Sequence, residues 1–314
     1  MFRLLFAAII MAATSVVANA QSSLDPNRPI RFVIPFAPGG QSDTAVRIVA
    51  EEIARMRPAT VENRTGGFIA IGGQFVMSQP SDGHTLLNIG NGYSTTRQYI
   101  PEMTFDPREE FSPVSILIRV PKVLMVPSVN SIQDLPTLIS SIRARPDFYT
   151  NPTTGGGGTL AMAGTLFTRA INGSVINVPY RGSAPAVSDF LAGRLSMMFD
   201  TVPIGSQIHG RGARIIAVTS DERLRNYPDI PTWREFGINE SIYSYQGIFV
   251  KSNTPRHIRE QLNSLIVQAL RSPNVRNRFL ALGLDESWIN EYNLDQTEAF
   301  INSEVNTWRG IFGK

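Results

Sequence analysis

The most informative local pattern in the sequence is IRFVIPFAPGGQSD, at residues 30–43. Its apolar run up to Phe36 is typical of a buried strand, and Pro38-Gly39-Gly40 interrupts that run. From Asp43 to Met56 apolar residues recur at helical spacing. The stretch therefore predicts a strand that ends in a glycine loop and leads directly into a helix.

Strands and helices are expected to alternate along the rest of the chain. Further strands are expected at residues 60–63, 85–89, 123–127, 148–150, 175–179, 195–200, 215–220 and 247–250. Further helices are expected at residues 72–78, 131–143, 159–171, 184–191, 255–271, 273–282 and 295–312. This alternation indicates parallel sheets with crossover helices. The expected fold is α/β, with two doubly wound lobes joined by a hinge. Residues 21–120 plus 241–314 are assigned to lobe 1 and residues 121–240 to lobe 2.

The N-terminus has the features of a secretory signal peptide. Arg3 precedes an apolar run at residues 4–13, and Ala18-Asn19-Ala20 has the small residues of a cleavage site. The alternative is a buried N-terminal helix. The run is too short to span a bilayer permanently, because a spanning helix needs roughly 20 apolar residues. Residues 1–20 are therefore predicted to be removed near Ala20/Gln21, which leaves a soluble protein in the periplasm.

Composition narrows the classes of function. The 314 residues are enough for two domains, and a net charge of +3 is too small to indicate nucleic-acid binding. The chain has no cysteine, which excludes disulfides, cysteine nucleophiles and cysteine-ligated metals.

Three loops share one physical design. They lie at residues 36–43, 153–159 and 179–186, each between an expected strand and an expected helix. Open α/β sheets bind ligands at such places, and the free N–H groups of a helix N-terminus attract anions. Each loop alone is a common turn, but three in a two-lobed chain favour a shared anion-binding cleft.

Motifs for nucleotide binding and for catalysis are absent from the sequence. It has no G-x-G-x-x-G, no G-x-x-x-x-G-K-[ST] and no G-x-S-x-G. His84, His209 and His257 are far apart and lack the spacing of metal ligands. We therefore expect no catalytic residue, no metal and no cofactor, and we expect that the protein is not an enzyme.

The motifs, taken in order, resemble those of one family. They are residues 29–40 (PIRFVIPFAPGG), 61–64 (VENR), 82–87 (DGHTLL), 111–114 (FSPV), 178–186 (VPYRGSAPA), 198–200 (MFD) and 217–220 (AVTS). In these the chain resembles the tripartite tricarboxylate transporter receptors, the Bug-type extracytoplasmic solute receptors, from about Pro29 to its end.

The resemblance implies a periplasmic-binding-protein type II fold, the Venus flytrap, whose lobes close on a ligand. It implies a receptor, expected to be monomeric, for an aliphatic di- or tricarboxylate or an aromatic carboxylate. The receptor would deliver this ligand to a membrane permease of one large and one small subunit. An alternative is a co-receptor that presents its ligand to a sensor kinase.

The resemblance also implies a set of site residues. In lobe 1 they are Phe36, Pro38, Gly39, Gly40, Ser42 and Asp43. In lobe 2 they are Thr154, Gly157, Gly158, Thr159, Tyr180, Arg181, Gly182, Ser183, Ala184 and Asp200.

The segment 90–97 departs from the family pattern but is expected to face the cleft. Asn91, Tyr93 and Ser94 are therefore added to the candidate ligand-binding residues. Two interpretations stay open for this segment. Either Tyr93 stacks on a ligand ring and Arg97 pairs with a second carboxylate, or Tyr93 packs within the lobe and Arg97 is exposed.

Overall fold

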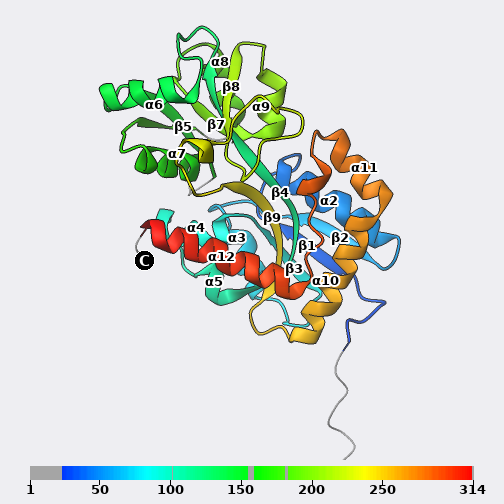
Figure 1. Ribbon diagram of the computed structural model, residues 1–314. Helices are drawn as coiled ribbons and strands as arrows, with labels where there is room; N and C mark the ends of the chain where they lie inside the picture. The colour runs from blue at the N-terminus through cyan, green and yellow to red at the C-terminus, as the bar shows by residue number, and fades with distance from the viewer. Residues whose placement is uncertain (1–22, 101, 155–158, 181–182, 313–314) are drawn as a thin grey trace, which may run out of the picture.

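The computed structural model describes residues 23–100, 102–154, 159–180 and 183–312. The predicted signal peptide lies outside these residues. The described chain forms two lobes joined by long strands (Figure 1). No helix in the described segments is long and apolar enough to cross a membrane.

Lobe 1 is built on the strand, loop and helix expected over residues 30–56. Strand β1 (Ile30–Ile34) lies between β2 (Ala59–Asn63) and β3 (Thr85–Ile89), and it pairs with both in parallel. Strand β9 (Tyr243–Lys251) then pairs antiparallel with β3. The sheet is therefore mixed, and its parallel part is the predicted part. The helices of this lobe are α2 (Gln41–Ala54), α3 (Ala70–Met77), α4 (Gly92–Tyr99), α5 (Pro107–Glu110), α10 (Arg256–Arg271) and α11 (Pro273–Ala281).

Lobe 2 carries the second set of alternating elements. Its strands are β5 (Thr150–Thr154), β6 (Ile176–Tyr180), β7 (Met198–Thr201) and β8 (Ala213–Val218). Its helices are α6 (Leu135–Ala144), α7 (Thr159–Ala170), α8 (Ser183–Leu191), α9 (Val202–Ile208) and the short η1 (Trp233–Phe236). Strands β5 and β6 pair in parallel, whereas β7 and β8 each pair antiparallel with β4.

One strand, β4 (Phe111–Pro127), crosses from lobe 1 to lobe 2 (Figure 1). Residues up to Pro121 pair with β9, and residues from Lys122 onward pair with β7 and β8. The strand expected at residues 123–127 is only the lobe 2 end of this element. Strand β9 is the return connection into lobe 1, so the two strands together form the hinge.

The C-terminal helix α12 (Leu294–Phe312) follows the short helix η2 (Glu286–Trp288) and contacts both lobes. Ile301 is buried in the core of lobe 1, and Trp308 is buried in a cluster with Phe199 and Trp233 of lobe 2. The helix therefore links the two lobes in addition to the hinge strands.

Glu304 lies on α12 between these two contacts and is expected to lower stability above neutral pH. Its Oε2 accepts hydrogen bonds from Asn91 Nδ2 at 3.5 Å and Trp308 Nε1 at 3.4 Å. Burial raises its pKa to about 7, and these hydrogen bonds offset only part of that effect. Below pH 4.5 the group is neutral in both states. Its ionisation cost develops as pH rises from 4.5 to about 7.

A Glu304→Gln variant should therefore unfold at higher urea concentration than the wild type at pH 8, and should lose this advantage at pH 4.5. Because Glu304 keeps some exposed surface, we expect a gain of about 1–2 kcal/mol at pH 8. The exposed Glu240→Gln is the control. An equal gain at both pH values would contradict this account.

Candidate functional site

A cleft of about 640 Å³ lies between the lobes. Lobe 1 contributes Gly39, Gly40, Gln41, Thr44, Ala45, Phe279, Leu282 and Leu284. Lobe 2 contributes Leu160, Ser183, Asp200, Thr201, Pro203, Ile204 and Gln207. The hinge strands contribute Ile118, Lys122 and Ser244. The cleft thus combines the β1–α2 loop of lobe 1 with the ends of lobe 2 strands and helices.

The N-terminus of α2 opens onto this cleft without a side-chain cap. Gly40 is the N-cap residue, and no side chain of the described residues caps the N–H groups of the first turn. Gly39 can adopt the loop because its φ is +82°, a region that L-residues rarely occupy. Free N–H groups and the positive end of the helix dipole favour an anion at this position.

Asp43 holds the β1–α2 loop in place. Its carboxylate accepts hydrogen bonds from the Gly39 N–H at 2.9 Å, from Arg47 Nε at 2.9 Å and from Asn63 Nδ2 at 2.8 Å. Burial acts to raise the pKa of Asp43, but the hydrogen bonds from Arg47, Gly39 and Asn63 outweigh it and leave the pKa lowered. The carboxylate is occupied within lobe 1, so Asp43 positions the loop and does not offer a free contact to a ligand.

An Asp43→Ala variant is expected to lose about 2–3 kcal/mol of unfolding free energy, because it leaves several hydrogen-bonding groups without their buried acceptor. Urea unfolding at pH 7 measures this loss. The exposed Asp229→Ala serves as a matched control. A loss no greater than that of the control would show that the loop holds its shape without Asp43.

Lys122 is a site residue that sequence reasoning missed. It lies on β4 at the hinge, lines the cleft and is only 3% exposed. Burial lowers the pKa of its amine to about 8, although the charge of Asp200 acts in the opposite direction. The sequence does contain a signal for this residue. Lys122 is one of only three lysines in the chain, and it lies within the otherwise apolar run VPKVLMV.

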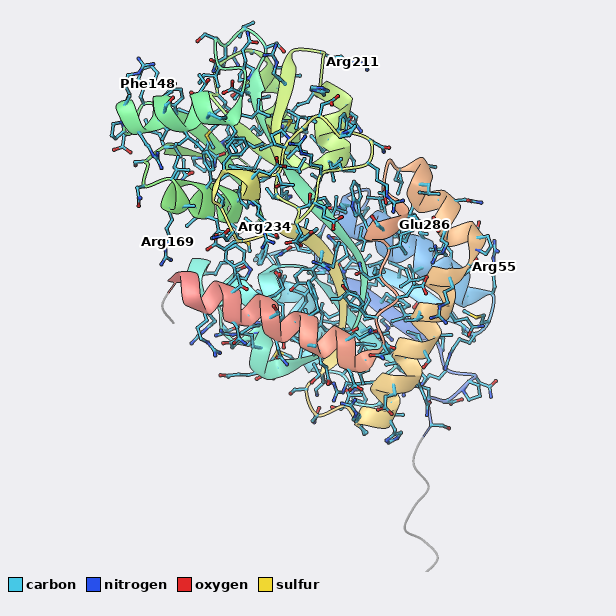
Figure 2. All side chains as sticks on the ribbon, in the orientation of Figure 1. Arg55, Phe148, Arg169, Arg211, Arg234 and Glu286 are labelled. Carbon is cyan, nitrogen blue, oxygen red and sulfur yellow. The ribbon has the colours of Figure 1, made fainter. Side chains whose placement is uncertain are left out.

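Asp200 faces the same cleft from β7 and is also 3% exposed. Its Oδ1 accepts the Thr201 N–H at 2.7 Å. Its Oδ2 is buried and has no hydrogen-bond partner among the described residues. The structure therefore leaves one strong acceptor unused in the cleft. The exposed Arg55 lies instead on the outer surface of lobe 1 (Figure 2).

A smaller cavity of about 100 Å³ shares Ser244 with the cleft. Phe36, Ser42 and Asn91 line it from lobe 1. Asn91 Nδ2 donates to the Tyr243 carbonyl at 2.9 Å, and its Oδ1 accepts the Tyr245 N–H at 3.2 Å. Asn91 therefore fixes the loop after β3 to hinge strand β9.

The segment after β3 follows the second of the two open interpretations. Tyr93 is 6% exposed, stacks on Phe249 with ring centroids 4.5 Å apart and donates its hydroxyl to the Phe111 carbonyl. Arg97 is exposed and lies 3.7 Å from Asp106. Tyr93 is thus a core residue of lobe 1 and does not line either cavity. Ser94 is buried beside it and lines neither cavity.

The remaining predicted ligand-binding residues of lobe 2 differ in where the structure places them. Ser183 lines the cleft, whereas Ala184 is exposed and Tyr180 donates its hydroxyl to Asp189 at 2.7 Å. Thr154 ends β5 and Thr159 begins α7. Gly157, Gly158, Arg181 and Gly182 lie outside the described residues. In lobe 1, Pro38 borders Gly39 but lines neither cavity.

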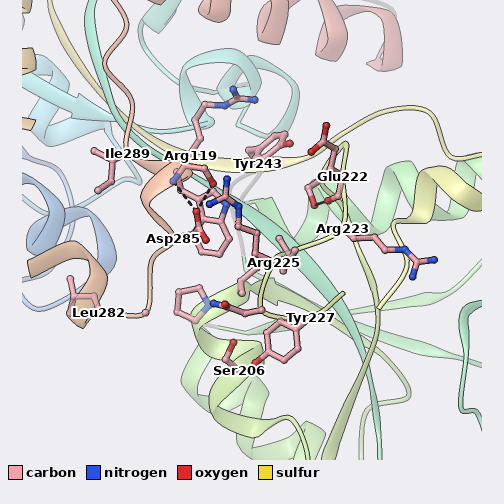
Figure 3. A pocket seen from close by; sticks show the side chains of 18 of the residues that line it. Arg119, Ser206, Glu222, Arg223, Arg225, Tyr227, Tyr243, Leu282, Asp285 and Ile289 are labelled. Carbon is pink, nitrogen blue, oxygen red and sulfur yellow. Dashed lines mark hydrogen bonds between the residues drawn. The ribbon is translucent and has the colours of Figure 1, made fainter. Parts of the chain in front are cut away.

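A larger cavity of about 960 Å³ lies beside the cleft and shares Pro203, Gln207 and Leu282 with it. Figure 3 shows it lined by Arg119, Arg223, Arg225, Tyr243 and Asp285, among others. Its charged groups are largely occupied. Arg223 bonds Glu235, Arg119 bonds the Tyr292 hydroxyl at 2.9 Å, and the charge of Arg225 acts on Asp285. We therefore place the candidate ligand site in the smaller interlobe cleft, where the buried Asp200 Oδ2 has no hydrogen-bond partner among the described residues.

No cluster of three or more His, Asp or Glu residues suited to a metal occurs in the part of the chain described. Two α/β lobes, a two-strand hinge and a polar cleft between them are the features of a solute-binding protein. The model of the family described as "Tripartite tricarboxylate transporter family receptor" matches residues 45–314. The chain belongs to this family of Bug-type receptors, and it is not an enzyme.

Individual relatives agree with this assignment. The "UPF0065 protein in tcbD-tcbE intergenic region" of Pseudomonas sp. (strain P51) is 35% identical, over 90% of this chain and 86% of that protein. The periplasmic binding protein BugD is 26% identical with a TM-score of 0.75, over 92% of this chain and 98% of that one. Rpa4515 of R. palustris, solved with adipate, is 25% identical with a TM-score of 0.78, over 91% and 96%. The predicted α/β two-lobed fold is confirmed.

Proposed function

We propose that this protein captures a small carboxylate in its interlobe cleft, outside the cytoplasmic membrane, and delivers it to a tripartite tricarboxylate-type permease of one large and one small subunit. The observation that carries the proposal is the cleft itself. It brings the uncapped N-terminus of α2 and the buried Lys122 into one cavity. Both favour a negative charge.

In this proposal the carboxylate first binds the β1–α2 loop, through backbone N–H groups at Gly40 and the residues after it. Lobe 2 then closes by bending at β4 and β9, and brings Ser183 and Asp200 to the ligand. Contacts to both lobes stabilise the closed state. The adipate bound by Rpa4515 supports a carboxylate ligand. The N-terminal pattern supports export with cleavage near Ala20/Gln21, and we propose a monomeric receptor.

A thermal-shift screen of the purified protein tests the proposal. The panel would contain C4 dicarboxylates, citrate, adipate, benzoate and terephthalate, with the amide of each as a neutral control. A ligand present at 100 times its dissociation constant adds about 2.7 kcal/mol to stability, which moves a melting curve by a few degrees. The expected result is a shift with one carboxylate and none with its amide. Equal shifts with both would overturn the proposal.

A further inference from the structure

The two larger cavities lie on opposite faces of the two-strand hinge. In the hinge, β4 pairs with β9 in an unbroken antiparallel register over residues 118–121 and 243–246. Side chains of directly paired residues point to one face, and successive residues along a strand point to opposite faces. Arg119 and Tyr243 therefore share one face, and both line the cavity of about 960 Å³. Ile118, Lys122 and Ser244 share the other face, and all three line the interlobe cleft.

Trp288 of η2 contacts both lobes from within the larger cavity. It lines this cavity but not the cleft. It is held on lobe 1, because the Asn290 N–H donates to the Leu117 carbonyl of β4 at 3.1 Å. Its side chain packs against the buried core of lobe 1 and also against the lobe 2 cluster that contains Val202 and Leu224. Trp288 is therefore a wedge between the lobes on the hinge face away from the cleft.

A charge attraction acts across the same cavity. Arg225 of lobe 2 and Asp285 of lobe 1 both line it, and Figure 3 shows the two side chains beside each other. A hydrogen bond from Ser287 lowers the pKa of Asp285 most, and the charge of Arg225 lowers it further. Because Arg225 is exposed, this attraction is worth little by itself. It acts in the same direction as the wedge, since it also holds the lobes together on this face.

Bending of the hinge toward the cleft separates the lobes on the opposite face. Among the described residues, the hydrogen bonds of the β1–α2 loop stay within lobe 1, so no such bond closes the cleft from this loop. Closure must pull Val202 and Leu224 away from Trp288 and expose apolar surface to water. The wedge contact therefore favours the open form.

We propose that Trp288 holds the cleft open in the ligand-free protein, so that a residue outside the cleft sets how tightly the cleft binds. The inference rests on the proposed function, because it needs a ligand that closes the cleft. Binding must supply the free energy that breaks the wedge contact, and the apparent affinity falls with the fraction of protein that is closed. Truncation of Trp288 should therefore raise both the closed population and the affinity.

Disulfide formation across the cleft measures the closed population without any ligand. The chain has no cysteine, so Gln41→Cys and Ser183→Cys, which line the cleft from opposite lobes, supply the only thiols. A disulfide needs the two Cα atoms within about 7 Å, so its rate with a fixed oxidant rises with the time that the cleft spends closed. Trp288→Ala should raise this rate about tenfold or more. Leu280→Ala removes an exposed apolar side chain that lines neither cavity, and this control should leave the rate unchanged.

A second cysteine pair separates closure from general loosening. Ala281→Cys and Asn226→Cys line the larger cavity from opposite lobes. In the Trp288→Ala background this pair should not oxidise faster, since closure of the cleft moves the two positions apart. Arg225→Glu places a carboxylate opposite Asp285 and should speed the cleft pair about threefold at low salt but not at high salt. If Trp288→Ala does not fold, as judged by circular dichroism, Arg225→Glu decides the question alone.

An unchanged rate for the cleft pair in Trp288→Ala would overturn the wedge, and so would faster oxidation of both pairs. These outcomes involve no ligand and leave the proposed function intact. If the rate rises as expected and the thermal-shift screen finds no carboxylate, the wedge stands and the proposed function fails. Where both hold, calorimetric titration should show that Trp288→Ala binds the carboxylate found in the screen about tenfold more tightly. An unchanged affinity would overturn the link between the wedge and binding.

Discussion

A Gly40→Val variant is expected to fold normally and to lose about 100-fold or more of its carboxylate affinity, because a side chain here covers the N–H groups at the start of α2. Gly40 has φ −76°, which any residue adopts, and a Cβ at this position would meet only the Ala37 carbonyl oxygen, at 3.7 Å. Calorimetric titration gives the affinity, and thermal unfolding gives the stability.

Gly40 is a position where a substitution tests ligand binding without disturbing the fold. Gly39 has φ +82°, and a Cβ at Gly90 would lie 2.6 Å from the Tyr245 carbonyl oxygen, so substitutions at these two positions would disturb the backbone itself. Gly310→Val is the control, since a Cβ there has no neighbour within 4 Å and the residue lies far along α12. Near wild-type affinity in a folded Gly40→Val protein would remove the β1–α2 loop from the site.

Lys122→Met is expected to stabilise the ligand-free protein by about 3 kcal/mol at pH 7 while it weakens ligand binding. Burial lowers the pKa of the amine from 10.5 to about 8, and each pKa unit corresponds to about 1.36 kcal/mol. The folded state therefore binds a proton less readily than the unfolded state. The cost of the charge is complete below pH 8 and disappears as pH rises toward 10.5.

Urea unfolding of both proteins at several pH values measures this difference. The gain should be largest at and below pH 7 and should shrink above pH 8, whereas Lys251→Met should show no such trend. A variant that is less stable than the wild type at pH 7 would contradict the account, because it would mean that the amine is satisfied in the free protein.

The expected result for Lys122→Met describes a cleft residue that is kept at a cost in stability. A methionine of similar length would fill the position of Lys122 without a desolvated charge. The chain instead holds a buried amine beside a buried carboxylate that has an unused acceptor. Sites that bind ligands often carry such destabilising groups, because the ligand supplies the missing partners.

Local patterns in the sequence are enough to predict the main strands and helices and the position of the first loop. The run from Ile30 to Phe36, the glycines after it and the helical spacing from Asp43 onward are contiguous, and their structure follows from local backbone and burial preferences. The alternation of strands and helices, and the position of each of the three loops before a helix, also follow from local sequence patterns. For this reason Gly39, Gly40 and Ser183 were predicted site residues and do line the cleft.

Contacts between distant segments determine which side chains line the cleft and which form bonds elsewhere in the protein. Strand β4 brings Lys122 beside Asp200, 78 positions later in the chain, through pairing with β7 that no local pattern specifies. The same long-range packing places Tyr93 in the core of lobe 1. It also commits Asp43 to Asn63 of β2, in addition to its local helical partner Arg47. Burial and partner choice depend on contacts between distant segments, and these contacts set the charge and the hydrogen-bonding capacity that remain for a ligand.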